Sequence, residues 1–347
     1  MSSMYNAARN YMPGLIIAVV IAAAAKFIAE HQQGSPLLYA LLLGMALKSV
    51  INEETSLPGI GFSAGTVLRI GVALLGLRIS LENVSQLGIT SLVVIVVSVG
   101  LTVLVGVFLA KKLGLDGPFG ILTGGATAIC GASAALAISN LLPKHENSER
   151  DTSFTVVAVT SLATLSMIFY PPIITALGFT DAEAGYLIGG TIHDVAQVVG
   201  AGEMISPEAQ NIATVTKLFR VALLIPVTLI IASYFHSPNG EARRVHVPCF
   251  LVLFVLFVAL RSLTPTLQST AGQMDMPFLV TITSSLPSVY QAASVVSGWI
   301  FAIAIAGVGL KTSLGDFKQF GWQAIALVVL LTAFITLFVG SATFLMH

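Results

Sequence analysis

Long apolar segments recur along the whole chain, and they constrain its fold more than any other feature of the sequence. A membrane-spanning helix needs about 20 mostly apolar residues, and eleven segments approach that template. Transmembrane barrels would show short alternating segments with far more polar residues. We therefore predict an all-α polytopic membrane protein with 10 or 11 helices, because the second segment is short and the seventh is weakly apolar. The segments lie near residues 12–29, 36–51, 61–80, 88–110, 118–140, 153–177, 183–202, 208–235, 248–263, 280–311 and 321–345.

The composition agrees with a chain that lies in the lipid bilayer. Charged residues make up 9% of the sequence, whereas soluble domains carry roughly 25%. No polar stretch is long enough to fold separately, so residues 1–347 are expected to form one membrane domain. The 16 basic and 16 acidic residues balance, which excludes nucleic acid as a partner. Cys130 and Cys249 have neither metal-ligand nor disulfide spacing, and we expect no metal and no cofactor.

The distribution of basic residues predicts the orientation. If every segment spans, one side of the membrane carries more Lys and Arg than the other, and the positive-inside rule places the N-terminus in the cytoplasm. We expect a multi-pass protein of the cell inner (plasma) membrane. The richer side holds Arg9, Lys48, Lys111, Lys112, Arg243, Arg244, Lys311 and Lys318, and the other holds Arg78, Lys144, Arg150 and Arg261.

One internal repeat is visible in the sequence. Residues 73–88 read ALLGLRISLENVSQLG and residues 306–321 read AGVGLKTSLGDFKQFG, which match without gaps at seven positions. The two copies fall in the third and tenth segments, so they would run in opposite directions across the membrane. Opposed copies predict an inverted-topology repeat of the kind that secondary transporters use, although chance similarity between Gly- and Leu-rich helices stays an alternative.

The fifth segment combines glycines with hydroxyl and thiol groups. Glycine costs roughly 1 kcal/mol relative to alanine inside a helix, so this run suggests a discontinuous helix whose freed N–H groups attract anions. Tight packing through small residues is the alternative. The candidate substrate-binding residues here are Gly124, Gly125, Thr127, Cys130, Gly131 and Ser133.

The seventh segment is the second candidate for a discontinuous helix. Gly189 and Gly190 precede Thr191, His193, Asp194 and Gln197, and His193 and Gln197 share one helical face. Asp and His are costly in hydrocarbon, so they are expected to face a cavity or a partner. An interfacial helix whose polar face meets lipid headgroups is the alternative. We assign Thr191, His193 and Gln197 to substrate binding, and Asp194 with His193 to coupling.

The eighth segment carries Lys217 and Arg220, three residues apart, in its first half. One interpretation is that both side chains extend to the membrane interface. The other is a cationic pair that faces the same cavity as His193 and Asp194.

These motifs closely resemble the YeiH-type family of proposed sulfate exporters over nearly the full chain. The stretches that carry the resemblance are TGGATAICGASA at 123–134, Tyr170-Pro171, GTIHDVAQV at 190–198 and Lys217 to Arg220. The resemblance implies a distant relationship to cation–proton antiporters and bile-acid-type symporters, whose folds use inverted repeats and crossing broken helices.

The leading hypothesis is secondary transport, by alternating access, of a small anion such as sulfate, sulfite or an organic sulfonate. Lys217 and Arg220 would neutralise its charge, while H⁺ or Na⁺ could serve as the coupling ion. No Walker-type loop is present. One alternative is a sodium–proton exchanger that uses Asp194. Another is a membrane-embedded enzyme with Cys130 as nucleophile, but we expect no enzyme. A homodimer is left open.

Overall fold

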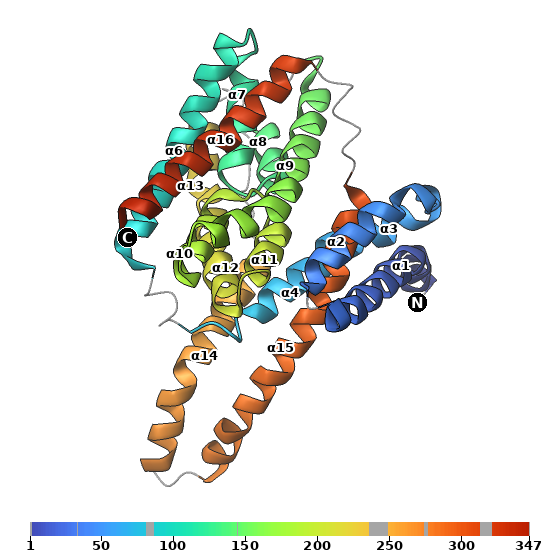
Figure 1. Ribbon diagram of the computed structural model, residues 1–347, viewed down its shortest axis with the longest axis vertical. Coiled ribbons are helices and arrows are strands. Elements are labelled where there is room, and N and C mark those ends of the chain that lie inside the picture. The colour runs from blue at the N-terminus through green and yellow to red at the C-terminus, as the bar shows by residue number, and fades with distance from the viewer. Residues whose placement is uncertain are drawn as a thin grey trace. The chain divides into compact units, whose positions relative to one another are not determined.

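The computed structural model describes residues 2–32, 34–80, 87–143, 145–235, 249–273, 277–312 and 321–346, and over these residues the chain is helical without strands. Within these described ranges, eight helices are long and apolar enough to cross a membrane. Each of the eleven predicted segments coincides with one helix or with consecutive helices. The prediction of an all-α polytopic membrane protein is confirmed (Figure 1).

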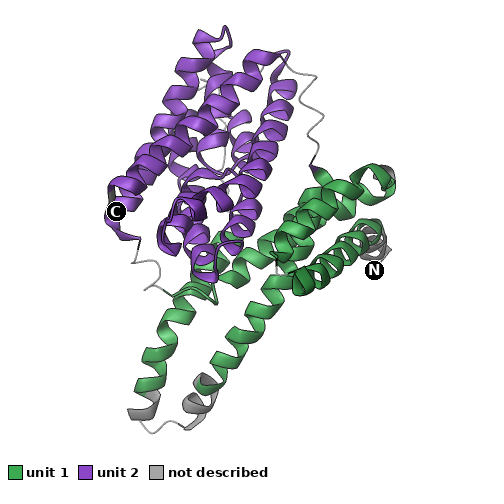
Figure 2. Ribbon diagram, in the orientation of Figure 1, with its two compact units in different colours: residues 1–86, 247–311 green, residues 87–246, 312–347 purple. Residues whose placement is uncertain are grey.

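The helices form two compact units, each assembled from two stretches of the chain (Figure 2). Unit 1 comprises Met1–Gln86 and Val247–Lys311. Backbones within it approach closely through glycines: a Cβ added to Gly14 would lie 2.1 Å from the Ser56 carbonyl oxygen. Its helices are α1 (Ser2–Gln32), α2 (Pro36–Leu47), α3 (Glu53–Phe62), α4 (Leu68–Leu75), α14 (Cys249–Gln273) and α15 (Pro277–Lys311), with a 3₁₀ turn at Lys48–Val50 and a π-helical turn at Ser63–Val67.

Unit 2 comprises Leu87–His246 and Thr312–His347, and it contains every candidate site residue. Two of its predicted segments are each split into a pair of short helices, α7 with α8 and α10 with α11. The helices are α6 (Gly88–Lys112), α7 (Gly117–Ala128), α8 (Ala132–Ser139), α9 (Ser148–Ala176), α10 (Asp181–Thr191), α11 (Val195–Glu203), α12 (Pro207–Ala222), α13 (Leu224–Tyr234) and α16 (Trp322–Met346).

Local sequence signals explain where the helices of unit 2 begin and end. Thr180 and Glu183 form a reciprocal capping box at the start of α10. Ser206 caps α12, where Pro207 occupies the first turn without needing an N–H partner. Gly178 follows the end of α9 with φ +75°, the left-handed conformation that glycine adopts without strain.

The predicted repeat lies partly outside the described residues, which exclude 81–86 and 313–320. The inverted-repeat relationship therefore stays a prediction. The cytoplasmic N-terminus, the single membrane domain and the homodimer likewise stay predictions.

Candidate functional site

The first discontinuity lies between α7 and α8. Helix α7 ends at Ala128 and α8 begins at Ala132, with Gly131 between them at φ 61° and ψ −123°. An L-residue other than glycine is strained in this conformation. Gly131 therefore allows the chain to leave α7 and enter α8. At this break the last carbonyls of α7 and the first N–H groups of α8 lack intrahelical partners.

Replacing Gly131 by alanine is expected to lower the free energy of unfolding by about 1–3 kcal/mol, because alanine would be held in a sparsely populated backbone region. Its Cβ would meet the nearest atom, the His193 carbonyl oxygen, at 3.4 Å, so the cost comes from the backbone. Gly100→Ala is the matched control, since Gly100 is an exposed position of α6 with open space around it. Thermal denaturation in detergent compares them, and equal stability would contradict the assigned strain.

The second discontinuity lies between α10 and α11. Helix α10 ends at Thr191, and α11 begins at Val195. Ile192 and Asp194 have extended backbones, with ψ 138° and 147°. No glycine lies between the two helices, so this break does not depend on one.

The breaks lie where the glycine-rich runs predicted them, but four of the glycines in these runs lie inside the helices. Gly124 and Gly125 belong to α7, and Gly189 and Gly190 belong to α10. A Cβ added to Gly189 would lie 2.4 Å from the carbonyl oxygen of Ala213 in α12. A Cβ added to Gly124 would lie 3.1 Å from the carbonyl oxygen of Thr102 in α6. These glycines serve close helix packing, whereas Gly131 serves the break.

The two breaks meet in space, and we call residues 128–132 and 191–195 the crossover. The Nδ1 atom of His193 lies 3.1 Å from the Thr127 carbonyl oxygen at the end of α7. Its Nε2 atom lies 2.9 Å from the Thr332 hydroxyl of α16. A carbonyl only accepts, so Nδ1 carries a proton. His193 thus ties both broken helices to α16.

Lys217 and Arg220 of α12 close the C-terminal ends of α7 and α10. The Lys217 ammonium donates to the carbonyls of Ile129 and Ile192 at 2.7 and 2.8 Å. Arg220 donates five hydrogen bonds, which match the five N–H groups of a guanidinium. Its acceptors are the carbonyl oxygens of Thr127, Ala128 (twice), Gly189 and Ile192, at 2.7–3.1 Å.

Both cations are fully buried, with 0% of each side chain exposed. Both side chains are enclosed by protein and do not extend to its surface, which contradicts the interpretation that they reach the membrane interface. The C-terminal end of each half-helix carries a partial negative charge of about −0.5, and its last carbonyls lack intrahelical donors. Lys217 and Arg220 supply both the charge and the donors.

The N-terminal ends of α8 and α11 are more accessible than the C-terminal ends of α7 and α10. Ser133 is exposed, and Ala132 and Asp194 are half-buried. Cys130 is 6% exposed beside them. Asp194 interacts electrostatically with Lys217 and Cys130. The accessible side of the crossover therefore offers helix N-termini, one hydroxyl and one carboxylate.

The remaining predicted residues line the interior around the crossover. The Thr191 hydroxyl donates to the Leu187 carbonyl. The Gln197 amide donates to the Thr164 hydroxyl of α9 at 3.3 Å. Two atoms of the predicted site are buried without a hydrogen-bond partner, the Thr127 hydroxyl and the Gln197 amide oxygen. Sequence reasoning missed Thr164 and Thr332, because no local pattern distinguishes them from other threonines that bond to their own helix.

The site offers no evident metal centre. Among the residues that the structure describes, no group of three His, Cys, Asp or Glu side chains is arranged to hold a metal ion. The side chains around the crossover can donate hydrogen bonds, carry charge and bind or release protons.

Comparison with known proteins identifies the family of this chain. A family model described as Conserved hypothetical protein 698 matches residues 13–328. A UPF0324 membrane protein of Chlorobaculum tepidum is 43% identical over 335 residues, 95% of this chain and 88% of the relative. UPF0324 membrane protein TauZ of Paracoccus pantotrophus is 42% identical over 340 residues, 96% of this chain and 95% of the relative.

More distant similarities complete the comparison. UPF0324 inner membrane protein YeiH of Escherichia coli K12 is 29% identical, with 97% of this chain and 95% of the relative covered. The sodium proton antiporter MjNhaP1 of Methanocaldococcus jannaschii is 15% identical, with 95% and 97% covered, and its TM-score of 0.28 is too low to show a shared fold. The resemblance predicted from the motifs is confirmed, and the chain belongs to the UPF0324 family of membrane proteins.

Proposed function

We propose that this protein is a secondary transporter of a small anion, and that the accessible side of the crossover is its binding centre. The observation that carries the proposal is the fixed charge at the crossover. Two cations, Lys217 and Arg220, are buried against the C-terminal ends of α7 and α10. They leave the N-terminal ends of α8 and α11 for a ligand.

The charges sum to a positive centre. Two half-helix C-termini contribute about −1 in total, and two N-termini contribute about +1. Lys217 and Arg220 add two positive charges and Asp194 adds one negative charge, so the net charge is about +1. Protonation of Asp194 raises it to about +2. A centre of this sign favours an anion, and helix N-termini provide backbone N–H donors for oxyanions.

The substrate that we propose is a sulfur oxyanion, namely sulfate, sulfite or an organic sulfonate, as the resemblance to proposed sulfate exporters implies. Export from a negative cytoplasm needs no coupling ion. A divalent anion gains about 4.6 kcal/mol at ~100 mV, twice the ~2.3 kcal/mol per charge. Concentrative import would need H⁺ or Na⁺, and Asp194 and His193 are the groups that would couple it. We place the protein in the inner membrane, as the name of the Escherichia coli relative states for that protein.

Two other functions make different demands on the same residues. A sodium–proton exchanger would use Asp194 as a carboxylate that binds cations in turn, but the two buried cations beside the break oppose a bound sodium ion. An enzyme would need a base next to Cys130. Both ring nitrogens of His193 are engaged by Thr127 and Thr332 instead, which argues against activation of the thiol.

Cys130→Ser is expected to retain measurable transport, because a hydroxyl can replace the thiol as a small lining group. Cys249→Ser is the matched control, since Cys249 lies outside unit 2 and is exposed. Flux per correctly inserted molecule in proteoliposomes compares them. Complete loss in a folded Cys130→Ser protein would favour covalent chemistry.

The proposed function is tested by flux of radiolabelled sulfate, sulfite and sulfonate into proteoliposomes, with acetate and sodium as comparison ions. Ser133→Ala should lower the affinity for the transported anion by about tenfold, because a hydrogen bond to a charged group contributes about 1.5–3 kcal/mol. Ser139→Ala is the matched control on the same helix, since that hydroxyl donates to the Leu136 carbonyl. Sodium–proton exchange without anion flux would overturn the proposal.

A further inference from the structure

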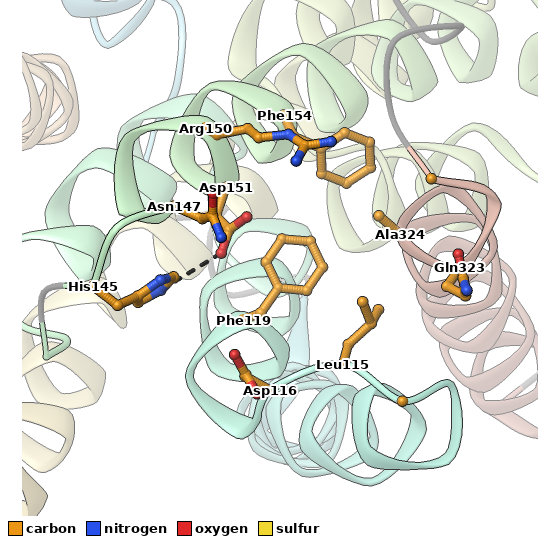
Figure 3. A pocket seen from close by; sticks show the side chains of 12 residues that line it. Leu115, Asp116, Phe119, His145, Asn147, Arg150, Asp151, Phe154, Gln323 and Ala324 are labelled. Atoms are coloured by element: carbon orange, nitrogen blue, oxygen red, sulfur yellow. Dashed lines mark ion pairs between the residues drawn. The ribbon is translucent and has the colours of Figure 1, made fainter.

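A second polar site lies at the end of unit 2 where α7, α9 and α16 begin. It is a cavity of about 270 Å³ lined by the α6–α7 connection, the α8–α9 connection and the first turns of α9 and α16 (Figure 3). Its ionisable side chains are Asp116, His145, Arg150 and Asp151. His145 Nε2 lies 3.6 Å from Asp151 Oδ2. Two carboxylates and one imidazole, side chains that can bind and release protons, thus lie at this opening.

Three helices lead from this cavity to the crossover, and they pack against one another. Phe119 and Ala324 line the cavity, and each lies eight residues before a residue that contacts His193, namely Thr127 and Thr332. Eight helical residues rise about 12 Å. Asp151 likewise lies eight residues before Val159, whose side chain faces Gly131. All three helices therefore place the crossover about 12 Å below the cavity.

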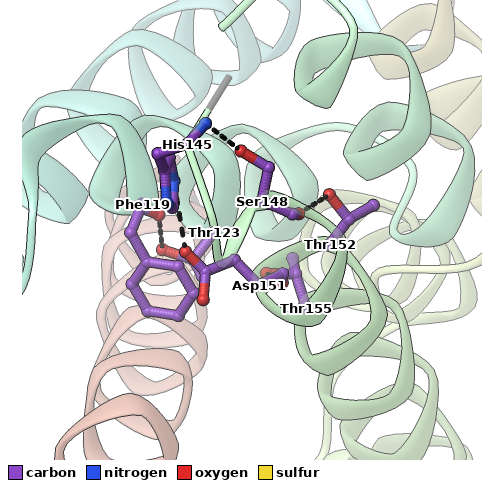
Figure 4. A network of polar contacts seen from close by, with 7 residues as sticks. All are labelled: Phe119, Thr123, His145, Ser148, Asp151, Thr152 and Thr155. Carbon is purple, nitrogen blue, oxygen red and sulfur yellow. Dashed lines mark hydrogen bonds and ion pairs between the residues drawn. The ribbon is translucent and has the colours of Figure 1, made fainter. Parts of the chain in front are cut away.

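Threonine hydroxyls occupy the interval between the cavity and His193. Thr123 and Thr155 lie one turn below the cavity, and each hydroxyl donates to the carbonyl one turn nearer the opening, as Figure 4 shows. Each oxygen can still accept a hydrogen bond. The Thr127 hydroxyl lies a turn deeper, is 0% exposed and has no hydrogen-bond partner. A buried hydroxyl without a partner indicates a position for a water molecule.

An aromatic pair lines the cavity on the two helices that carry Thr123 and Thr155. The rings of Phe119 and Phe154 lie 5.9 Å apart, and their side chains are 6% and 2% exposed. Both rings line the cavity, so in the proposal below they are the groups that must move before water reaches the hydroxyls.

We propose that the cavity is the entrance for protons, which travel along the threonines of α7, α9 and α16 to the imidazole of His193. We call this route the proton path. The inference rests on the proposed function, because it identifies H⁺ as the coupling ion and separates its route from the anion at the N-terminal ends of α8 and α11.

The last step follows from the hydrogen bonds of Thr332. Its hydroxyl has one proton and two neighbours that can accept it, the His193 Nε2 atom and the Val328 carbonyl at 2.8 Å. With neutral His193, Thr332 donates to Nε2. A proton arriving by way of water binds Oγ1 while the original hydroxyl proton moves to Nε2, and the new O–H donates to Val328. Lys217 and Arg220 of α12 face the resulting imidazolium, and an anion at the crossover would offset the added charge.

Cysteine accessibility tests the proton path without reference to any transported ion. In a Cys130→Ser, Cys249→Ser chain, Thr123→Cys should react with a small thiol reagent about tenfold faster or more when Phe119→Ala is added, since labelling follows the population of the open form. Thr102→Cys is the matched control. Like Thr123, Thr102 is 0% exposed and donates a hydrogen bond to its own helix, but it lies on α6, which is not part of the proton path. Equal effects of Phe119→Ala on both cysteines, or none on either, would overturn the path.

Proton movement tests the end of the path. In proteoliposomes with an internal pH dye, Thr332→Val should lower proton-coupled flux by at least about tenfold more than it lowers anion–anion exchange, because it removes a proton-transfer group. Thr343→Val is the matched control, a buried threonine of α16 that bonds to Val339. Equal loss of both fluxes in Thr332→Val would overturn the path. Absence of all anion flux from the parent protein would instead overturn the proposed function, and the cysteine comparison would still decide the path.

Discussion

Replacing Arg220 by methionine is expected to lower the free energy of unfolding by about 3–5 kcal/mol, the cost of breaking a buried charge system. Methionine fills a similar volume but donates no hydrogen bond. The carbonyls of Ala128 and Gly189 lose the donors that Arg220 gives them, and each unsatisfied buried acceptor costs about 1–3 kcal/mol. The C-terminal ends of α7 and α10 also lose a compensating charge. Anion transport should be abolished, because the crossover can no longer hold its geometry.

The control for this substitution is Arg69→Met, because Arg69 is an exposed arginine of α4. It should change stability by about 0.5 kcal/mol or less, as for most surface positions. Arg220→Lys should fall between the two, since it keeps the charge but loses the planar arrangement of five donors. Thermal denaturation and monodispersity in detergent measure all three. A stable, transport-active Arg220→Met protein would show that the guanidinium does not hold the crossover.

Hydropathy alone predicted the membrane class and the positions of the helices, since burial in lipid requires long apolar segments whatever the tertiary contacts are. Hydropathy does not tell which glycine in a glycine-rich run lies at a break. Gly124 and Gly189 have no side chain, so they suit both a break and a close contact, and only the neighbouring backbones of Thr102 and Ala213 decide between these uses. Gly131 differs because the chain direction requires a positive φ there.

The composition of the site was predictable in part. His193 and Asp194 were recognised as costly in a membrane, and Lys217 with Arg220 was recognised as a possible cationic pair. The structure gathers all four around one crossover. Their partners were not predictable, because Lys217 and Arg220 bind main-chain carbonyls, which every residue possesses. Thr332 lies 139 residues from His193 in the sequence, and a threonine in an apolar helix gives no signal of such a contact.

The crossover also shows why its cations and its carboxylate should have different functions. Lys217 and Arg220 are 0% exposed and donate to carbonyls, so a ligand experiences their charge at a distance. Asp194 is half-buried at the start of α11, so its charge can change during a transport cycle. The cations set a constant potential, and the carboxylate is the group that can modulate it.

Asp194→Asn is expected to bind the transported anion about tenfold tighter than the parent protein at neutral pH, and to lose most of the pH dependence of binding. The substitution removes one negative charge from the accessible side of the crossover and raises its net charge from about +1 to about +2. Two unit charges ~4 Å apart interact by about 4 kcal/mol at an effective dielectric of ~20. A tenfold change requires only about 1.4 kcal/mol, so a partly screened charge suffices.

The direction of the pH effect follows from the same charges. Protonation of Asp194 removes its negative charge, as the substitution by asparagine does. The parent protein should therefore bind the anion more tightly as the pH falls. The affinity of the variant should stay near the affinity that the parent reaches at low pH. Sulfate is the ligand for this test, because its charge is constant through the neutral range. Calorimetry from about pH 3.5 to 8 spans the ordinary pKa of an aspartate, about 3.9, and that of imidazole, about 6.5, and it compares the parent, Asp194→Asn and Asp181→Asn. Asp181 is the control because it is exposed at the first residue of α10, eleven residues before the break. That separation exceeds the screening length of about 8 Å at physiological salt. Replacing Asp181 should therefore leave the affinity for sulfate unchanged. If Asp194→Asn binds sulfate as the parent does at every pH, the carboxylate is structural and coupling belongs to His193 alone.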